Sequence, residues 1–178
     1  EAYEYFQFTC DRGVMKGSEG LIRAADSLNR AEAAKVTTKI ISEDETVESV
    51  FSLFANLGPT TSVNYDDVTV GDWYASFVYY LFREGILVDR RLFHPAETLN
   101  AAEAMKLVIE SYAGLNEEVL NELEEVKNFD QWYEPYQKLA SYVDADIAFV
   151  EPSAPAKRVH IAELLFKLYE AYPVEKFE

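Results

Sequence analysis

Cysteine, basic side chains and long apolar runs are all scarce in this 178-residue sequence. The single cysteine, Cys10, cannot form an intramolecular disulfide, and we expect it to serve as a small buried hydrophobe. The chain has 16 lysine and arginine residues against 32 aspartate and glutamate residues, for a formal net charge of −16. This charge argues against nucleic acid or an anionic membrane surface as the main partner, because both require a basic face.

No apolar run approaches the ~20 residues that a membrane-spanning helix needs, so no membrane span is expected. Hydrophobic residues nevertheless make up 49% of the chain and aromatic residues 14%, which is typical of a globular protein and not of a disordered one. A domain of this length can hold one core, or a few small repeats that share a core.

Motifs for catalysis and for metal binding are also missing. The sequence has no glycine-rich phosphate loop, nucleophile elbow, zinc-protease helix motif or calcium loop, so we expect neither an enzyme nor a cofactor. His94 and His160 lie in no metal-ligand spacing. The glutamates of residues 117–125 are expected to form a solvated helix face, with Val119 and Leu120 turned toward the core.

Helical periodicity dominates the chain, and no useful length of sequence alternates as a β-strand does. We therefore expect an all-α fold. Asp72 is a plausible N-cap for one helix, and Gly13 and Gly85 are well placed to end helices in the left-handed conformation. Helices are expected over residues 2–12, 30–41, 45–57, 73–84, 101–113, 116–127 and about 161–172, with residues 59–71 as a polar, turn-rich connection.

One short stretch, residues 28–33, recurs in the chain. It returns at residues 99–104 and more loosely at residues 159–164, each time at the start of an apolar, helix-periodic run. The spacing indicates three copies of one helix-loop-helix unit with insertions between them.

The start of each clear copy has the composition of a capping box. Asn29 and Asn100 are good N-caps, and Glu32 and Glu103 follow three residues later, where a carboxylate can reach the N–H of the cap. Arg30 needs another explanation, because a cation in the first helical turn opposes the helix dipole.

The second copy carries a series of landmarks in order: Asp67-Val68, Asp72-Trp73-Tyr74, Gly85-Ile86-Leu87, Phe93-His94-Pro95 and Leu99-Asn100-Ala101-Ala102-Glu103. This order resembles that of the S-layer homology domain. The first copy matches in Gly13-Val14-Met15 and in the stretch around Arg30, and the third in Phe129, Trp132 and Ala162-Glu163. The resemblance implies one pseudo-threefold module of three repeats (residues 1–44, 61–114 and 128–178) with inserted helices at 45–60 and 115–127.

Such a module fixes secreted proteins to the bacterial cell surface. In the family, grooves between repeats hold an acidic, commonly pyruvylated cell-wall polysaccharide, and a motif arginine supplies the cation. Arg30 matches that arginine, whereas Ala101 and Ile161 stand at the equivalent positions unless Arg158 reaches in from the preceding loop.

Five residues are therefore candidate ligand contacts, and most have a structural alternative. Arg30 could instead form a salt bridge, and Asp72 could simply cap its helix. The two tryptophans could stack on sugars, although core packing is the more common role of a large aromatic residue. The candidates are Arg30, Asp72, Trp73, Trp132 and Arg158.

We expect an extracellular, cell-surface protein that binds an acidic cell-wall polysaccharide. Because two motif arginines are replaced, the alternative is a divergent copy of the fold that docks on another surface protein or assembles with itself. An accessory domain of a secreted carbohydrate-active enzyme is a third possibility.

Overall fold

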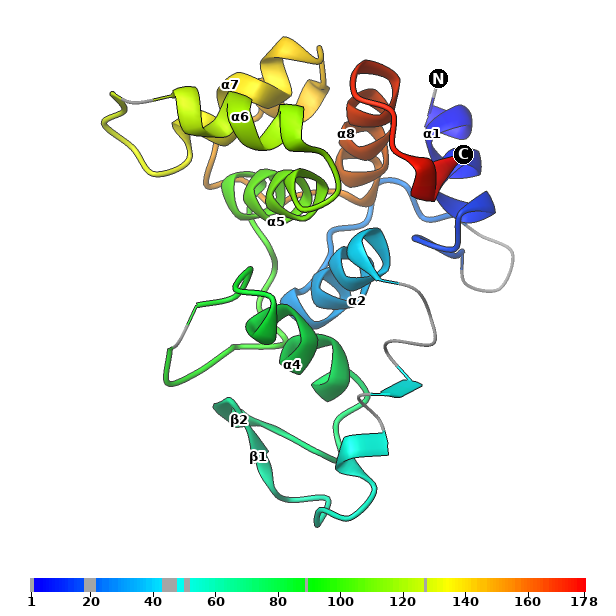
Figure 1. The fold of residues 1–178 in the computed structure, drawn as a ribbon, viewed down its shortest axis with the longest axis vertical. Coiled ribbons are helices and arrows are strands. Elements are labelled where there is room, and N and C mark those ends of the chain that lie inside the picture. Colours follow the sequence, from blue (N-terminus) through cyan, green and yellow to red (C-terminus); the bar gives the residue numbers. More distant parts are fainter. Residues whose placement is uncertain (1, 18–21, 43–47, 50–51, 89, 127) are drawn as a thin grey trace. The chain divides into compact units, whose positions relative to one another are not determined.

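The computed structural model describes residues 2–17, 22–42, 48–49, 52–88, 90–126 and 128–178. The expected all-α character is confirmed over this part of the chain (Figure 1). The helices are α1 (Ala2–Asp11), α2 (Arg30–Ile41), α4 (Ala75–Arg83), α5 (Ala101–Ala113), α6 (Glu117–Glu125), α7 (Glu134–Tyr142) and α8 (Arg158–Ala171), with short 3-10 helices η1 (Asp146–Phe149) and η2 (Glu175–Phe177).

Two of the expected segments differ in detail. The connection expected over residues 59–71 contains a small antiparallel hairpin, in which β1 (Ser62–Val63) pairs with β2 (Tyr65–Thr69). The helix expected over residues 45–57 lies partly outside the described residues, and positions 48–49 and 52–54 of it are helical.

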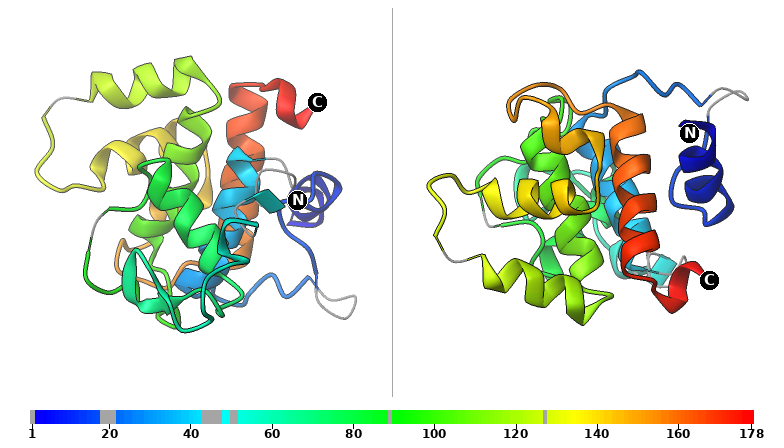
Figure 2. Two further views of the ribbon diagram at one scale, coloured as in Figure 1. Left: turned by 60° about the horizontal axis from the view of Figure 1, so that its bottom comes forward. Right: turned by 90° about the horizontal axis from the view of Figure 1, so that it is seen from above.

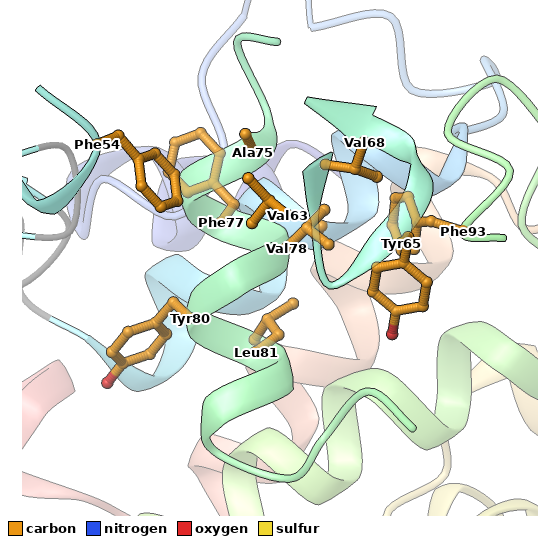
Figure 3. Packing of buried hydrophobic residues seen from close by; sticks show 11 residues of the cluster. Phe54, Val63, Tyr65, Val68, Ala75, Phe77, Val78, Tyr80, Leu81 and Phe93 are labelled. Atoms are coloured by element: carbon orange, nitrogen blue, oxygen red, sulfur yellow. The ribbon is translucent and has the colours of Figure 1, made fainter. Parts of the chain in front are cut away.

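The chain divides into two compact units: residues 1–28 with 98–178, and residues 29–97. In the second of these, α2 packs against α4, and α4 buries six of its nine residues. Figure 3 shows the side chains of α4 and of the hairpin meeting in one core. The cluster comprises Ala34, Phe54, Val63, Tyr65, Val68, Ala75, Phe77, Val78, Tyr80, Leu81 and Phe93.

In the other unit, α1 packs against α8 and lies beside it in both views of Figure 2. The ring of Phe8 lies 5.4 Å from that of Phe166 and 5.1 Å from that of Tyr169. Arg12 joins this aromatic cluster, with its guanidinium carbon 4.0 Å from the centre of the Phe8 ring and its Nε donating to the carbonyl of Phe177 at 2.6 Å. Cys10 is half-buried and not fully buried as expected.

The same type of left-handed turn occurs at the ends of three helices. Gly13 and Gly85 adopt φ values of 68° and 76°, which confirms their expected role at the ends of α1 and α4. Asp144 follows α7 with φ 57° and takes the same place. In each turn the next N–H donates back into the helix, from Val14 to Thr9, from Ile86 to Leu81 and from Ala145 to Ala140.

Other expectations at the ends and faces of helices are wrong. Asp72 does not cap α4, because Tyr74 is the N-cap residue and no side chain caps that helix. Helix α8 begins at Arg158 and not near Ile161. On α6, Val119 is buried as expected, but Leu120 is 43% exposed.

Candidate functional site

The starts of α2, α5 and α8 share one backbone arrangement. The first N–H groups of a helix have no partner within the helix, and they need one when they are not exposed to water. In all three helices the first two N–H groups donate to carbonyls of a loop that is distant in sequence. The two accepting residues of each loop are two positions apart in the sequence. The bonds run from Arg30 to Glu97 (2.9 Å) and Ala31 to Pro95 (3.1 Å), from Ala101 to Ala154 (2.8 Å) and Ala102 to Pro152 (3.0 Å), and from Arg158 to Asp26 (2.8 Å) and Val159 to Ala24 (3.1 Å).

The three loops that supply these carbonyls contain the same turn. A backbone N–H donates to the carbonyl three residues earlier, from Asp26 to Arg23, from Glu97 to His94 and from Ala154 to Glu151. Arg23 and His94 have positive φ values of 54° and 58°, and each side chain faces the acidic residue that ends its turn.

This arrangement corrects the alignment of the third copy. Arg158, and not Ile161, occupies the position of Arg30 at the start of its helix. His160 then takes the place of the capping-box glutamate, and the N–H of Lys157 donates to its Nδ1 at a long 3.4 Å. Glu163 lies further along α8 and is only 5% exposed, so the expected match of Ala162-Glu163 to the motif is wrong.

The side chains of Arg30 and Arg158 both donate hydrogen bonds to backbone carbonyls near the starts of their helices. Nε of Arg30 donates to the carbonyl of Phe93 at 2.7 Å, and its guanidinium carbon lies 5.2 Å from the centre of the Phe93 ring. Nε of Arg158 donates to the carbonyl of Ile22 at 3.3 Å, and its Nη2 donates to the carbonyl of Lys16 at 3.1 Å. These bonds explain why a cation is tolerated in the first turn, against the helix dipole. Both residues are half-buried, and these hydrogen bonds hold each guanidinium in position.

The loop beside Arg30 is in turn held by Asp67, a residue that the sequence identified only as a landmark. Its Oδ1 accepts the N–H of Phe93 at 2.7 Å, and its Oδ2 accepts the N–H of His94 at 2.8 Å. Its neighbour Asp66 forms an exposed ion pair with Arg91 at 2.9 Å. The Asp-Val landmark ahead of a Phe-x-Pro loop was the available signal for Asp67, but nothing in it specified the bonded partners.

Asp72 and Trp73 lie where the hairpin meets α4. The carboxylate of Asp72 accepts hydrogen bonds from the N–H of Thr69 at 2.7 Å and from its hydroxyl at 3.0 Å. Asp72 therefore stabilises the turn that follows β2. Burial, followed by the nearby charge of Asp72, raises the pKa of Tyr74. Trp73 is 53% exposed and stacks edge-on against Tyr74 at 5.4 Å.

Trp132 has the same local setting ahead of α7. It is 50% exposed, and its ring meets that of Tyr133 edge-on at 5.7 Å. The two tryptophans are therefore not core residues as expected, because both side chains are about half exposed, although the ring of Trp73 also contacts that of Phe77 in α4 at 6.5 Å. The structure places Arg30, Asp72 and Trp73 in one compact unit, and Trp132 and Arg158 in the other.

Across the described residues, no group of three or more histidine, cysteine, aspartate or glutamate side chains could hold a metal ion. In the same part of the chain, no helix combines the length and the apolar character needed to cross a membrane.

A scan against models of known protein families finds no match to this chain, and a search of curated proteins finds no relative.

Proposed function

We propose that this chain is an S-layer-homology-like module, with three repeats in a pseudo-threefold arrangement, that anchors an extracellular protein to the bacterial cell wall. It does so by binding an acidic cell-wall polysaccharide, with Arg30 and Arg158 as the cations that contact the polymer. The observation that carries this proposal is that both arginines stand at the first position of a helix and both donate Nε to a loop carbonyl.

The chemistry suits a carboxylate ligand. A guanidinium is planar and permanently charged, and it can grip a carboxylate through two charge-assisted hydrogen bonds. Because Nε is already committed to the backbone, the orientation of each guanidinium is set before the ligand arrives, which lowers the entropy cost of binding. Two arginines attract an anionic polymer more strongly than Arg30 alone, which was the only motif arginine in the sequence alignment. The second cation is important because the net charge of −16 repels such a polymer.

Other contacts differ between the copies. Ala101 stands at the equivalent position of α5 and has no side chain to offer, so the proposal has two sites and not three. The half-exposed ring of Trp73, in the same compact unit as Arg30, supplies a stacking surface for a sugar. Asp72 is occupied by Thr69, so it supports the hairpin rather than the ligand.

Binding to bacterial walls that carry a pyruvylated polymer tests the proposal. We expect the chain to co-sediment with intact walls and not with walls from which the acidic polymer has been extracted. Arg30→Ala and Arg158→Ala should each weaken binding about 10- to 100-fold, as the loss of a charge-assisted contact implies. Arg83→Ala is the matched control, because Arg83 is an exposed arginine that pairs with Glu84.

The folding of each variant must be checked by thermal melting, because Arg30→Ala also removes the bond to Phe93. Arg30→Lys keeps the charge and should restore part of the affinity. If folded Arg30→Ala and Arg158→Ala both bind walls as tightly as the parent chain, the polysaccharide proposal is wrong.

The second candidate is a protein–protein module built on the same fold. It is favoured by the loss of arginine at Ala101 and by the exposure of α6, which buries only Val119 among its nine residues. A second copy of the chain and a different surface protein are both possible partners for such a face.

A further inference from the structure

A second basic residue follows the carbonyl that holds Arg30. The carbonyl of Phe93 accepts Nε of Arg30 at 2.7 Å, and the same peptide group continues into His94. The N–H of Arg30 donates to the carbonyl of Glu97 at 2.9 Å, so the loop is bonded to this arginine on both sides of His94. The side chain of His94 is 49% exposed, and its Nδ1 lies 3.5 Å from the carboxylate of Glu97.

The start of α8 repeats this arrangement. The carbonyl of Ile22 accepts Nε of Arg158 at 3.3 Å, and the next residue is Arg23. The N–H of Arg158 donates to the carbonyl of Asp26 at 2.8 Å. The side chain of Arg23 is 61% exposed, and its Nη2 lies 2.6 Å from the carboxylate of Asp26. Each site arginine is therefore held by a carbonyl whose peptide group leads into an exposed basic side chain.

The third copy of the arrangement has the opposite charge. Ala101 replaces the site arginine at the start of α5, and the loop bonded to this helix carries Glu151 where the other two loops carry a basic residue. The carboxylate of Glu151 is bonded within its own loop, to the N–H of Ser153 at 3.1 Å and to its hydroxyl. The loop position is thus basic in the two copies that keep arginine and acidic in the copy that lacks it.

The backbone does not explain the basic side chains of Arg23 and His94. Their φ values of 54° and 58° lie in the left-handed region, which favours glycine and asparagine. Pairing with an exposed carboxylate contributes little to stability. The turn alone therefore gives no reason for a basic residue at both positions.

We propose that Arg23 and His94 are the second cations of the two polysaccharide sites, so that each site binds the polymer with two basic side chains. This inference rests on the proposed function and specifies its ligand more closely, as a segment in which two acidic groups lie close together. In the free protein the second cations face Asp26 and Glu97, and the acidic groups of the polymer replace these carboxylates as partners.

The two second cations differ in their response to pH. An arginine stays charged at all relevant pH values, whereas a histidine gains its charge as the pH falls from about 8 to about 5. Carboxylates of the polymer stay ionised over this range. The ionisable residues that contact His94 or its neighbours in the loop are Glu97 of the same loop, Asp67 of β2 and Arg30 of α2. Affinity at the Arg30 site should therefore depend on pH, and affinity at the Arg158 site should not.

Titration calorimetry with a pyruvylated wall polysaccharide, released from its wall, tests each site separately. Arg158→Ala leaves the Arg30 site, and Arg30→Ala leaves the Arg158 site. Both backgrounds also carry His160→Gln, because His160 is the other histidine of the chain and lies in the first turn of α8. From about pH 7.5 to about pH 5.5, affinity should rise roughly fivefold in the Arg158→Ala background and change less than about twofold in the Arg30→Ala background.

Exchanging the second cations should exchange this behaviour. His94→Arg should keep the affinity of the Arg30 site high at both pH values. Arg23→His should weaken the Arg158 site roughly fivefold at about pH 7.5 and restore it at about pH 5.5. Each replacement is a residue that the equivalent turn already holds, and thermal melts at both pH values check the folding. Arg83→His is the matched control, because Arg83 is exposed and pairs with Glu84, and it should add no pH dependence.

The outcomes separate this inference from the proposal on which it rests. If the parent chain does not bind the polymer, or if Arg30→Ala and Arg158→Ala leave binding unchanged, both the proposed function and this inference are wrong. If these arginine variants weaken binding but neither pH nor the exchanged residues alter it, only this inference is overturned. Arg23 and His94 would then serve their turns alone.

Discussion

Replacing Asp67 tests the claim that the loop beside Arg30 depends on one carboxylate. The half-buried Asp67 accepts two backbone N–H groups, at 2.7 and 2.8 Å. A hydrogen bond to a charged group contributes roughly 1.5–3 kcal/mol, and removing one partner leaves the other unsatisfied. We expect Asp67→Ala to lower the free energy of unfolding by about 3 kcal/mol, because solvent can compensate part of the loss at a half-buried site.

Urea denaturation measures this loss. With a denaturant slope of roughly 2 kcal/mol/M, the midpoint should fall by about 1.5 M. Asp67→Asn keeps one acceptor oxygen and should lose about half as much. The matched control is Asp66→Ala, which breaks only the exposed ion pair with Arg91 and should cost under about 1 kcal/mol.

A local measurement separates loop release from general destabilisation. The same loop accepts the N–H groups of Arg30 and Ala31 at 2.9 and 3.1 Å. In Asp67→Ala, hydrogen exchange at those two amides should accelerate under native conditions, before exchange in the interior of α2. The reasoning would be refuted if these amides kept their protection, or if Asp66→Ala cost as much as Asp67→Ala.

Three further changes probe other parts of the structure. Asp144→Gly should stabilise the chain by about 1 kcal/mol in thermal melts, because Asp144 has φ 57°, whereas Gly85→Ala at φ 76° should destabilise it by a similar amount. Combining Lys157→Asn with His160→Glu would rebuild the capping box at the start of α8, and urea denaturation should show a gain of about 1–2 kcal/mol. Burial, followed by the charge of the nearby Asp146, raises the pKa of Glu163. Ionisation of Glu163 therefore destabilises the folded state, and the free energy of unfolding falls as the pH rises above the ordinary glutamate pKa. Glu163→Gln should therefore match the parent chain at low pH and be more stable than it at neutral pH, as melts across that range would show.

The sequence predicted those parts of the fold that depend on neighbouring residues. Both capping boxes are present, with the N–H of Asn29 donating to Glu32 at 3.0 Å and that of Asn100 to Glu103 at 3.1 Å. A cap and its partner lie three residues apart, so their identities alone define the contact. The left-handed glycine turns were predictable for the same reason.

What the sequence could not predict depends on distant partners. The bonds of Asp67 span 26 and 27 residues, and no local pattern specifies them. The third copy was misaligned because Lys157 and His160 replace the asparagine and glutamate that identify the other two. Trp73 and Trp132 were expected in the core, since the preference of aromatic residues for burial does not show which ring a small unit leaves exposed.

The division of the chain has a consequence for its synthesis. Residues 29–97 form a continuous unit, whereas the other unit joins residues 1–28 to residues 98–178. The ribosome therefore releases α1 before residues 29–97 and its partner α8 after them, so Phe8 is without the rings of Phe166 and Tyr169 until the intervening unit has been made. We expect the unit of residues 29–97 to fold while the chain is still being made, and the aromatic face of α1 to need protection until α8 emerges.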